Sequence, residues 1–374
     1  MHIESIKVHP LLGGTVDGGW PAGHEPEDDL HAIVEVLTDD GLSGIGSVFT
    51  NSALVKAGVK TLEPLWQGES VEQPERVSEK LRQSSFWQGR GGSLEHVISG
   101  IDIALWDLFG KITGQPVSRL LGGCYRDRIK PYASMLFDEP EILRDRLTAT
   151  VARGFRAIKL GWRPFGRRDH GFDELLVQTA RDAVGADVDL LVDAGGSEEF
   201  WPHRYKWALR TAQMLAQYDV GWFEEPLPPD DLEGYARLTE VSPLPIAGGE
   251  VLTRRQAFQP WIERRAVDIL QPDVTKCGGL SEVRRIAWQA YDAGIQVVSH
   301  GWNTAIGVAA DLHLAAAMPV AKYVEFLTPA PYIDEIIEQP FELDSDGCLA
   351  VPSGAGLGIE LNREALKRFA SPRE

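Results

Sequence analysis

Cysteine is scarce in this chain, and long apolar runs are absent. The 374 residues include three cysteines, Cys124, Cys277 and Cys348, which are widely spaced and odd in number. A disulfide framework or a zinc site is therefore not expected, and a reducing cytoplasm is the expected location. No apolar stretch approaches the roughly 18 residues that span a bilayer, and residues 1–5 lack the basic and apolar regions of a signal peptide.

The chain also has fewer basic than acidic residues. The formal net charge is −18 at pH 7, which argues against nucleic acid and anionic membrane as partners. An anionic small molecule is still compatible with this balance, but a cation or local Lys and Arg side chains would have to offset the overall field.

The first 125 residues read as a small α+β domain. Residues 30–37 alternate partly between apolar and polar, Asp39-Asp40-Gly41 supplies a hairpin turn, and residues 42–49 read as the return strand. A stretch rich in helix formers follows and stops near Gly122-Gly123.

From residue 126 to 340 the pattern becomes a repeated strand-then-helix unit. Eight strands, each but the last clearly followed by a helix, predict an α/β fold of the (β/α)₈ barrel type with a modified eighth helix. The rival is a doubly wound sheet, which requires an early glycine-rich phosphate loop, and none is present. Residues 341–374 have their own glycine-rich turns and are expected to return to the small domain. The strands are expected to end near Ser134, Lys159, Asp193, Glu224, Glu250, Asp273, His300 and Glu325.

Three of these strand ends are acidic: Asp193, Glu224 and Glu250. In a parallel barrel the carboxyl ends of the strands meet at one rim, so the three carboxylates should lie close together. They would repel one another unless a hard cation lay between them. The sequence therefore predicts a Mg²⁺ site.

Four further ionisable residues end neighbouring strands: Lys159, Asp273, His300 and Glu325. Barrel enzymes carry out their chemistry at this rim, whereas a single polar strand end is usually only solvated. Seven ionisable residues at successive strand ends favour a reaction site over solvation.

The order of these residues resembles the enolase superfamily, specifically its mandelate racemase branch. The resemblance covers nearly the whole chain, including the N-terminal capping domain. It rests on Val192-Asp193-Ala194, Phe223-Glu224-Glu225-Pro226, Gly248-Gly249-Glu250, Gln271-Pro272-Asp273 and Ser299-His300-Gly301.

The resemblance implies one Mg²⁺ held by Asp193, Glu224 and Glu250, with Glu225 as the alternative ligand on its strand. The remaining roles are implied in the same way. His300 would be the general acid/base, Asp273 would fix its tautomer, and Lys159 and Glu325 would contact the substrate carboxylate. Asp273 distinguishes the chain from the muconate-lactonising branch, which has a catalytic Lys there. Lys276, three residues later, is expected to be a solvated loop lysine.

The chain departs from the racemase pattern on the second strand. That pattern is Lys-x-Lys, whereas this chain has Lys159-Leu160-Gly161, so the usual second base is missing. Residue 195 is Gly, where galactonate-dehydratase-like members carry a His. A single histidine can remove an α-proton and then protonate a β-hydroxyl leaving from the same face. The expected activity is therefore that of an acid-sugar dehydratase, a hydro-lyase giving a 2-keto-3-deoxy acid from an aldonic or aldaric acid.

Other activities share the same enolate step. They are racemisation or epimerisation, with Lys159 as the second base, and lactone opening by a cycloisomerase. A binding protein without catalysis is the remote alternative, and it is disfavoured because such a protein would be free to lose these rim residues. Homo-oligomers are expected from the resemblance.

The substrate contacts expected from the sequence lie in loops. Trp20 and His24 fall in a glycine-rich segment that matches the family's closing loop. Arg167, with Arg168 beside it, could pair with a distal carboxylate and would then favour a diacid. Asn303 is a candidate hydroxyl contact or a helix N-cap.

Overall fold

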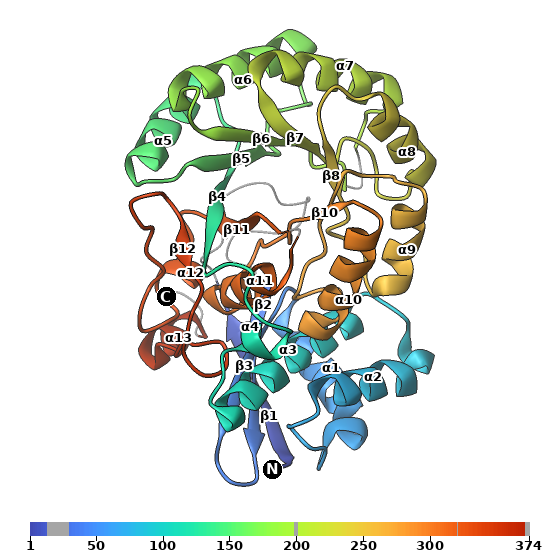
Figure 1. Ribbon diagram of the computed structural model, residues 1–374, viewed down its shortest axis with the longest axis vertical. Coiled ribbons are helices and arrows are strands. Elements are labelled where there is room, and N and C mark those ends of the chain that lie inside the picture. The colour runs from blue at the N-terminus through green and yellow to red at the C-terminus, as the bar shows by residue number, and fades with distance from the viewer. Residues whose placement is uncertain (13–29, 198–200, 320, 371–374) are drawn as a thin grey trace.

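The computed structural model describes residues 1–12, 30–197, 201–319 and 321–370. A curled sheet surrounded by an arc of helices makes up the larger part, and a small sheet with three long helices lies beside it (Figure 1). Within the described residues, no helix is long and apolar enough to cross a membrane.

The N-terminal part is an antiparallel sheet covered by helices. The sheet has the order β1-β2-β3, and the predicted hairpin is confirmed as the β2–β3 pair. Its turn contains Gly41 at φ +89°, a left-handed conformation that glycine adopts at little cost. The elements are β1 (Ile3–Leu11), β2 (His31–Thr38), β3 (Ser43–Val48), α1 (Ser52–Trp66), α2 (Pro74–Ser84), α3 (Ser93–Thr113) and α4 (Val117–Leu120).

The larger part is the predicted (β/α)₈ barrel. Its strands are β4 (Arg128–Leu136), β5 (Ala157–Gly161), β6 (Asp189–Asp193), β7 (Val220–Glu224), β8 (Ile246–Gly248), β9 (Ile269–Leu270), β10 (Gln296–Val297) and β11 (Tyr323–Leu327). Its helices are α5 (Pro140–Ala152), α6 (His170–Val184), α7 (Tyr205–Leu215), α8 (Leu232–Val241), α9 (Arg255–Glu263), α10 (Gly279–Asp292) and α11 (Ala305–Ala317). The helix directly after β11 is the short α12 (Pro331–Asp334), which agrees with the expected modified eighth helix.

The last strand of the barrel sheet lies beside its first strand. Strands β4 to β10 pair in sequence order, and β11 pairs in parallel with β4. The inward-facing side chains of these strands fill the barrel, as in other packed barrels. They form a separate apolar cluster that contains Tyr132, Leu191, Trp222 and Val298. This cluster gives the strand ends a rigid support.

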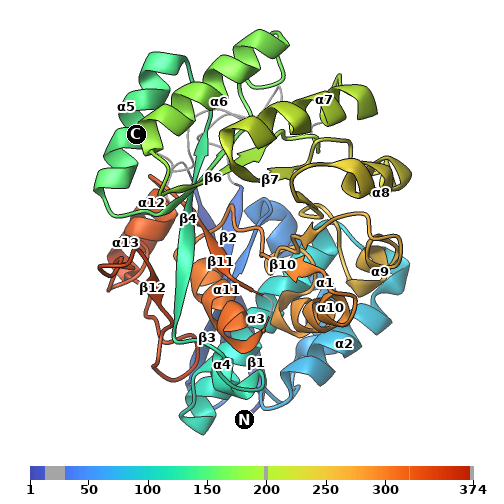
Figure 2. The same ribbon diagram turned by 45° about the horizontal axis from the view of Figure 1, so that its top comes forward.

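The small sheet and the barrel are joined through α3. Figure 2 shows α3 beside α10, and the two helices are in direct contact. Asp102 of α3 accepts a hydrogen bond from the backbone N–H of Ser281 (3.0 Å) and another from its hydroxyl. Gly279 makes this close approach possible, because a Cβ there would lie 2.3 Å from the Asp102 carboxylate.

The C-terminal segment contacts both parts. Strand β12 (Leu349–Ala350) pairs antiparallel with β4, and α13 (Arg363–Phe369) lies against β1. Arg363 forms an ion pair with Glu35 of β2 (2.6 Å). The backbone N–H of Leu357 donates to Asp107 of α3 (2.8 Å). These contacts hold the segment across the boundary between the small sheet and the barrel.

Candidate active site

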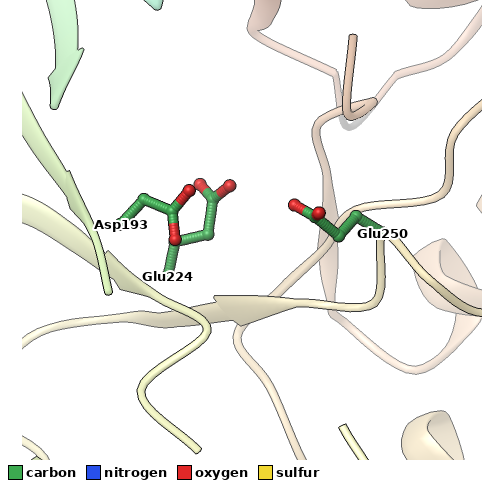
Figure 3. A group of neighbouring side chains, drawn as sticks. All are labelled: Asp193, Glu224 and Glu250. Carbon is green, nitrogen blue, oxygen red and sulfur yellow. The ribbon is translucent and has the colours of Figure 1, made fainter. Parts of the chain in front are cut away.

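The structure brings the three predicted acidic residues together. Asp193 and Glu224 end β6 and β7, and Glu250 follows β8 (Figure 3). All three side chains are buried, and one oxygen of each lies within 4.8 Å of the others. Adjacent parallel strands produce this proximity, because Asp193 and Glu224 are partners in the β6–β7 register.

Hydrogen bonds fix the orientation of two of these carboxylates. Asp193 Oδ1 accepts from the backbone N–H of Gly195 (2.7 Å). Glu224 Oε2 accepts from the indole of Trp222 (2.9 Å) and from the amide of Gln271 (2.7 Å). These hydrogen bonds hold the carboxylates of Asp193 and Glu224 in fixed orientations at the rim.

The electrostatics of this cluster fit a divalent cation. Burial raises the pKa of Asp193 well above its ordinary range, and the neighbouring Glu224 carboxylate raises it further. The pKa of Glu224 is raised as well, first by burial. A hard cation with oxygen ligands would remove this penalty, and three carboxylates in one cluster are a suitable donor set for Mg²⁺.

Lys159 of β5 lies beside these carboxylates. Its Nζ donates to Glu224 Oε1 and lies 3.1 Å from Glu325 Oε1 and 5.3 Å from the centre of the Tyr132 ring. Burial opposes the charged form, but Glu224 and Glu325 outweigh it and raise the pKa of Lys159 above its ordinary value. Lys159 is therefore a fixed positive charge and not a base in this arrangement.

His300 and Asp273 form a buried pair on the adjacent side of the rim. Their backbones are linked by a parallel bridge, and His300 Nδ1 lies 2.7 Å from Asp273 Oδ2. The other oxygen, Oδ1, accepts from the backbone N–H (2.7 Å) and the hydroxyl (2.6 Å) of Thr275. Burial opposes ionisation of Asp273, but the hydrogen bond to His300, the nearby Lys276 ammonium and the hydrogen bond from Thr275 together outweigh burial and lower the pKa of Asp273 to about 2. An ionised Asp273 holds the proton on Nδ1 and leaves Nε2 of His300 as the acceptor.

Nε2 of His300 lies on the same side as the acidic cluster, 3.5 Å from Glu250 Oε2. Glu325 lies at the end of β11, where its Oε2 accepts from the backbone N–H of Gly301 (2.6 Å). Burial opposes ionisation of Glu325, but Lys159, His300 and the hydrogen bond from Gly301 together outweigh burial, and the pKa of Glu325 is lowered to about 2.

These residues surround a cavity of about 180 Å³. Gly161 contributes only backbone, and a Cβ there would lie 3.0 Å from Asp193. The cavity is lined by Phe49, Ser134, Met135, Leu136, Lys159, Gly161, Trp162, Asp193, Ser197, Glu250, Lys276, His300, Trp302 and Glu325.

The expectation for Lys276 was wrong. Lys276 is not a solvated loop lysine, because the residue is 8% exposed and lines the cavity. The turn after β9 directs it inward, and Phe49 covers it, with Nζ 4.6 Å from the ring centre. Phe49 is distant from Lys276 in the sequence, so this contact could not be predicted from the sequence of the loop that contains Lys276.

Two predicted substrate contacts lie elsewhere. Arg167 is exposed and stacks over Trp201, 4.7 Å from the ring centre, and it does not line the cavity. Asn303 is buried against the small sheet, where its Oδ1 accepts from the Ser47 hydroxyl (3.2 Å). Asn303 is not the N-cap of α11 either, because that position is Thr304. Trp20 and His24 lie outside the described residues.

The sequence interpretation missed the aromatic wall of the cavity. Phe49 follows β3 and stacks on His31 (4.6 Å between ring centres), while its other neighbour is the His300 ring (6.5 Å). Trp162 follows β5 in a left-handed conformation (φ +58°), and Trp302 follows His300. The signal available in the sequence for the two tryptophans was an aromatic residue two or three positions after a rim residue, Trp302 after His300 and Trp162 after Lys159.

This fold and this rim define a class, the barrel enzymes that place acidic and basic side chains at the carboxyl ends of their strands. Residues 24–122 match the mandelate racemase / muconate lactonizing enzyme N-terminal domain, and residues 143–365 match the enolase C-terminal domain-like family. The chain belongs to the enolase superfamily, in its mandelate racemase branch, whose members bind Mg²⁺.

Named relatives cover the whole chain. D-galactarolactone cycloisomerase of Agrobacterium fabrum is 35% identical over 100% of both chains. Arabinonate dehydratase of Saccharolobus solfataricus is 33% identical over 90% of this chain and 89% of its own. The crystal structure of a racemase from Streptomyces coelicolor A3(2) with bound magnesium has 29% identity and a TM-score of 0.86, and covers 98% of this chain and 99% of that one.

Proposed function

We propose that this protein is a Mg²⁺-dependent dehydratase of an acid sugar. One observation carries the proposal: His300, held by Asp273, lies beside the acidic cluster with Nε2 3.5 Å from Glu250 Oε2, whereas the position of a second base is the bare Gly161. A single acid/base beside a carboxylate-binding site suits β-elimination, because both proton transfers can occur on one face.

The cation supplies fixed positive charge beside the substrate carboxylate when it is bound by Asp193, Glu224 and Glu250. The ammonium group of Lys159 adds a second fixed charge on the same side of the cavity. Together these charges offset the negative charge that develops when a proton leaves the carbon next to a carboxylate.

His300 Nε2 takes the α-proton, and the ionised Asp273 stabilises the resulting imidazolium. The C–H electron pair forms a carbon–carbon double bond, and the β-carbon–oxygen bond breaks. The imidazolium then gives its proton to the departing hydroxyl, so that water leaves and His300 returns to its starting state. The enol product becomes the 2-keto-3-deoxy acid.

Lactone opening is the second candidate. It is favoured by the 35% identity over the full chain to a D-galactarolactone cycloisomerase. In this reaction the leaving oxygen departs as a carboxylate, which needs no proton from an acid. The arabinonate dehydratase relationship favours the first candidate, and both reactions use the same removal of an α-proton by His300.

Proton NMR in D₂O tests the proposal. The protein is incubated with Mg²⁺ and a panel of aldonic acids, aldaric acids and their lactones. A deuterated 2-keto-3-deoxy product from a free acid supports dehydration, and the same product from a lactone alone supports the second candidate. Deuterium at C2 with every hydroxyl retained would show exchange or epimerisation and overturn both.

A further inference from the structure

Among the residues that the structure describes, Lys276 is a buried ammonium group without a close anionic partner. It is 8% exposed, and its side chain lines the cavity. The nearest carboxylate, Oδ2 of Asp273, is 4.0 Å from Nζ, which is beyond hydrogen-bonding distance. No hydrogen bond to Nζ is found among the described residues. Its other contact is the face of Phe49.

Asp273 has little capacity left for Lys276. Its Oδ2 is 2.7 Å from His300 Nδ1, and its Oδ1 accepts two hydrogen bonds from Thr275. The second cationic side chain of the cavity lining, Lys159, differs because Glu224 and Glu325 surround it. Burying an ammonium group is costly unless hydrogen bonds replace its water. Lys276 is therefore poised to receive an anion from a ligand.

We propose that Lys276 binds a second carboxylate of the substrate, so that the substrate has the carbon skeleton of an aldaric acid. This inference rests on the proposed function and names its substrate class. A free aldaric acid carries the second carboxylate from the start. In an aldaric 1,4-lactone the ring ester oxygen leaves with the electron pair of the broken C–O bond and becomes that carboxylate. The ammonium group of Lys276 therefore binds the second carboxylate in both reactions, the dehydration of the free acid and the opening of the lactone.

The arginines that the sequence favoured for this role are placed differently. Arg168 is exposed and forms an ion pair with Glu139, and Arg167 stacks on Trp201. Neither lines the cavity. Arg168→Met is therefore a matched control, because it removes the same charge as Lys276→Met from outside the cavity.

Calorimetric binding of two unreactive probes in the presence of Mg²⁺ tests the proposal without turnover. The probes are 2-oxoglutarate, a dianion, and 2-oxopentanoate, which has the same chain length and one carboxylate. A charge-assisted hydrogen bond predicts that the wild type prefers the dianion by roughly ten- to a hundredfold. The preference should disappear in Lys276→Met and persist in Arg168→Met and Lys276→Arg. Equal binding of both probes by the wild type, or an unchanged preference in Lys276→Met, overturns the proposal.

Steady-state kinetics separates substrate binding from mere support of Asp273. With an aldaric substrate, Lys276→Met should raise KM by a much larger factor than with the matching aldonic acid, which lacks the second carboxylate. An equal loss of kcat with both acids would assign Lys276 to positioning of the His300–Asp273 pair and overturn the proposal. If no acid sugar reacts, the proposed function fails, while the probe measurements still decide the role of Lys276.

Discussion

Glu224 and Glu225 are neighbours in the chain, but their carboxylates have different partners. Glu224 points into the barrel, where it contacts Lys159 and Gln271. Glu225 adopts a left-handed conformation (φ +41°) and its Oε2 accepts from the backbone N–H of Ser197 (3.2 Å). The turn of the backbone at residue 225 thus separates two adjacent acidic side chains.

This separation predicts that substitutions at the two positions differ. Glu224→Gln removes a charge from the acidic cluster, so we expect Mg²⁺ affinity to fall by roughly 10- to 100-fold or more, and activity with it. Glu225→Gln should leave Mg²⁺ affinity within about threefold of the wild type, because burial already raises the pKa of Glu225 and favours its neutral form. Isothermal titration of both variants checks this. The reverse order of affinities would assign the ligand to Glu225.

Mg²⁺ binding is expected to release protons. Burial and mutual repulsion raise the pKa values of Asp193 and Glu224 in the metal-free protein, so these carboxylates retain protons at a higher pH than usual. A bound cation requires their ionised forms. The apparent Mg²⁺ affinity should therefore rise with pH, and the observed binding enthalpy should vary with the ionisation enthalpy of the buffer. A Mg²⁺ binding enthalpy that is the same in every buffer would show that the metal-free acidic cluster holds no protons to release.

Asp273→Asn should impair catalysis without unfolding the protein. An amide is nearly the same size as a carboxylate but cannot hold the Nδ1 proton of His300 by charge. We expect kcat to fall by roughly 10²- to 10⁴-fold, with Mg²⁺ affinity close to that of the wild type. Kinetics and metal titration of the same preparation check both parts. A variant with near-normal kcat would remove Asp273 from the mechanism.

His313 of α11 should destabilise the protein in acid. Its Nδ1 accepts from the backbone N–H of Ser118 (3.2 Å), and its other nitrogen lies 3.1 Å from the carbonyl of Leu357. Burial lowers its pKa from 6.5 to about 4. Between pH 6.5 and about 4, the unfolded state therefore binds a proton at His313 that the folded state does not bind. The free energy of unfolding falls as the pH falls through this range.

The loss should amount to about 2 kcal/mol between pH 7.5 and pH 5 from this residue alone. Because other buried groups also titrate, the wild type is compared with His313→Gln by denaturant unfolding at both pH values. The variant should lose about 2 kcal/mol less than the wild type on acidification. Parallel losses in the two proteins would show that His313 does not contribute.

The sequence predicted the residues that depend on strand order. Asp193, Glu224 and Glu250 could be placed together because parallel neighbouring strands end at one rim. The pairing of Asp273 with His300 was implied by the resemblance to the family. Strand ends are local features of the sequence, and the barrel topology converts them into neighbours in space.

Residues that depend on packing between distant segments were not predictable in this way. Lys276 is buried because Phe49, on the loop after β3, lies over it. Asn303 directly follows the rim but points to Ser47 of the small sheet, because α11 and β3 pack together there. Arg167 has a nearby indole in Trp201 and stacks on it instead of reaching the cavity. The spacing of hydrophobic and polar residues along the sequence carries no information about contacts between distant segments.

The position of Phe49 has a consequence for how this protein could acquire new substrates. The reactive groups stand on the barrel, whereas this part of the cavity wall belongs to the small sheet and is backed by His31. Exchanging the small sheet and its loops between relatives would therefore alter selectivity while leaving the proton-transfer apparatus intact. Because substrate recognition and proton transfer are divided between the small sheet and the barrel, substitutions in the small sheet can change which substrate is bound while the reactive groups stay the same.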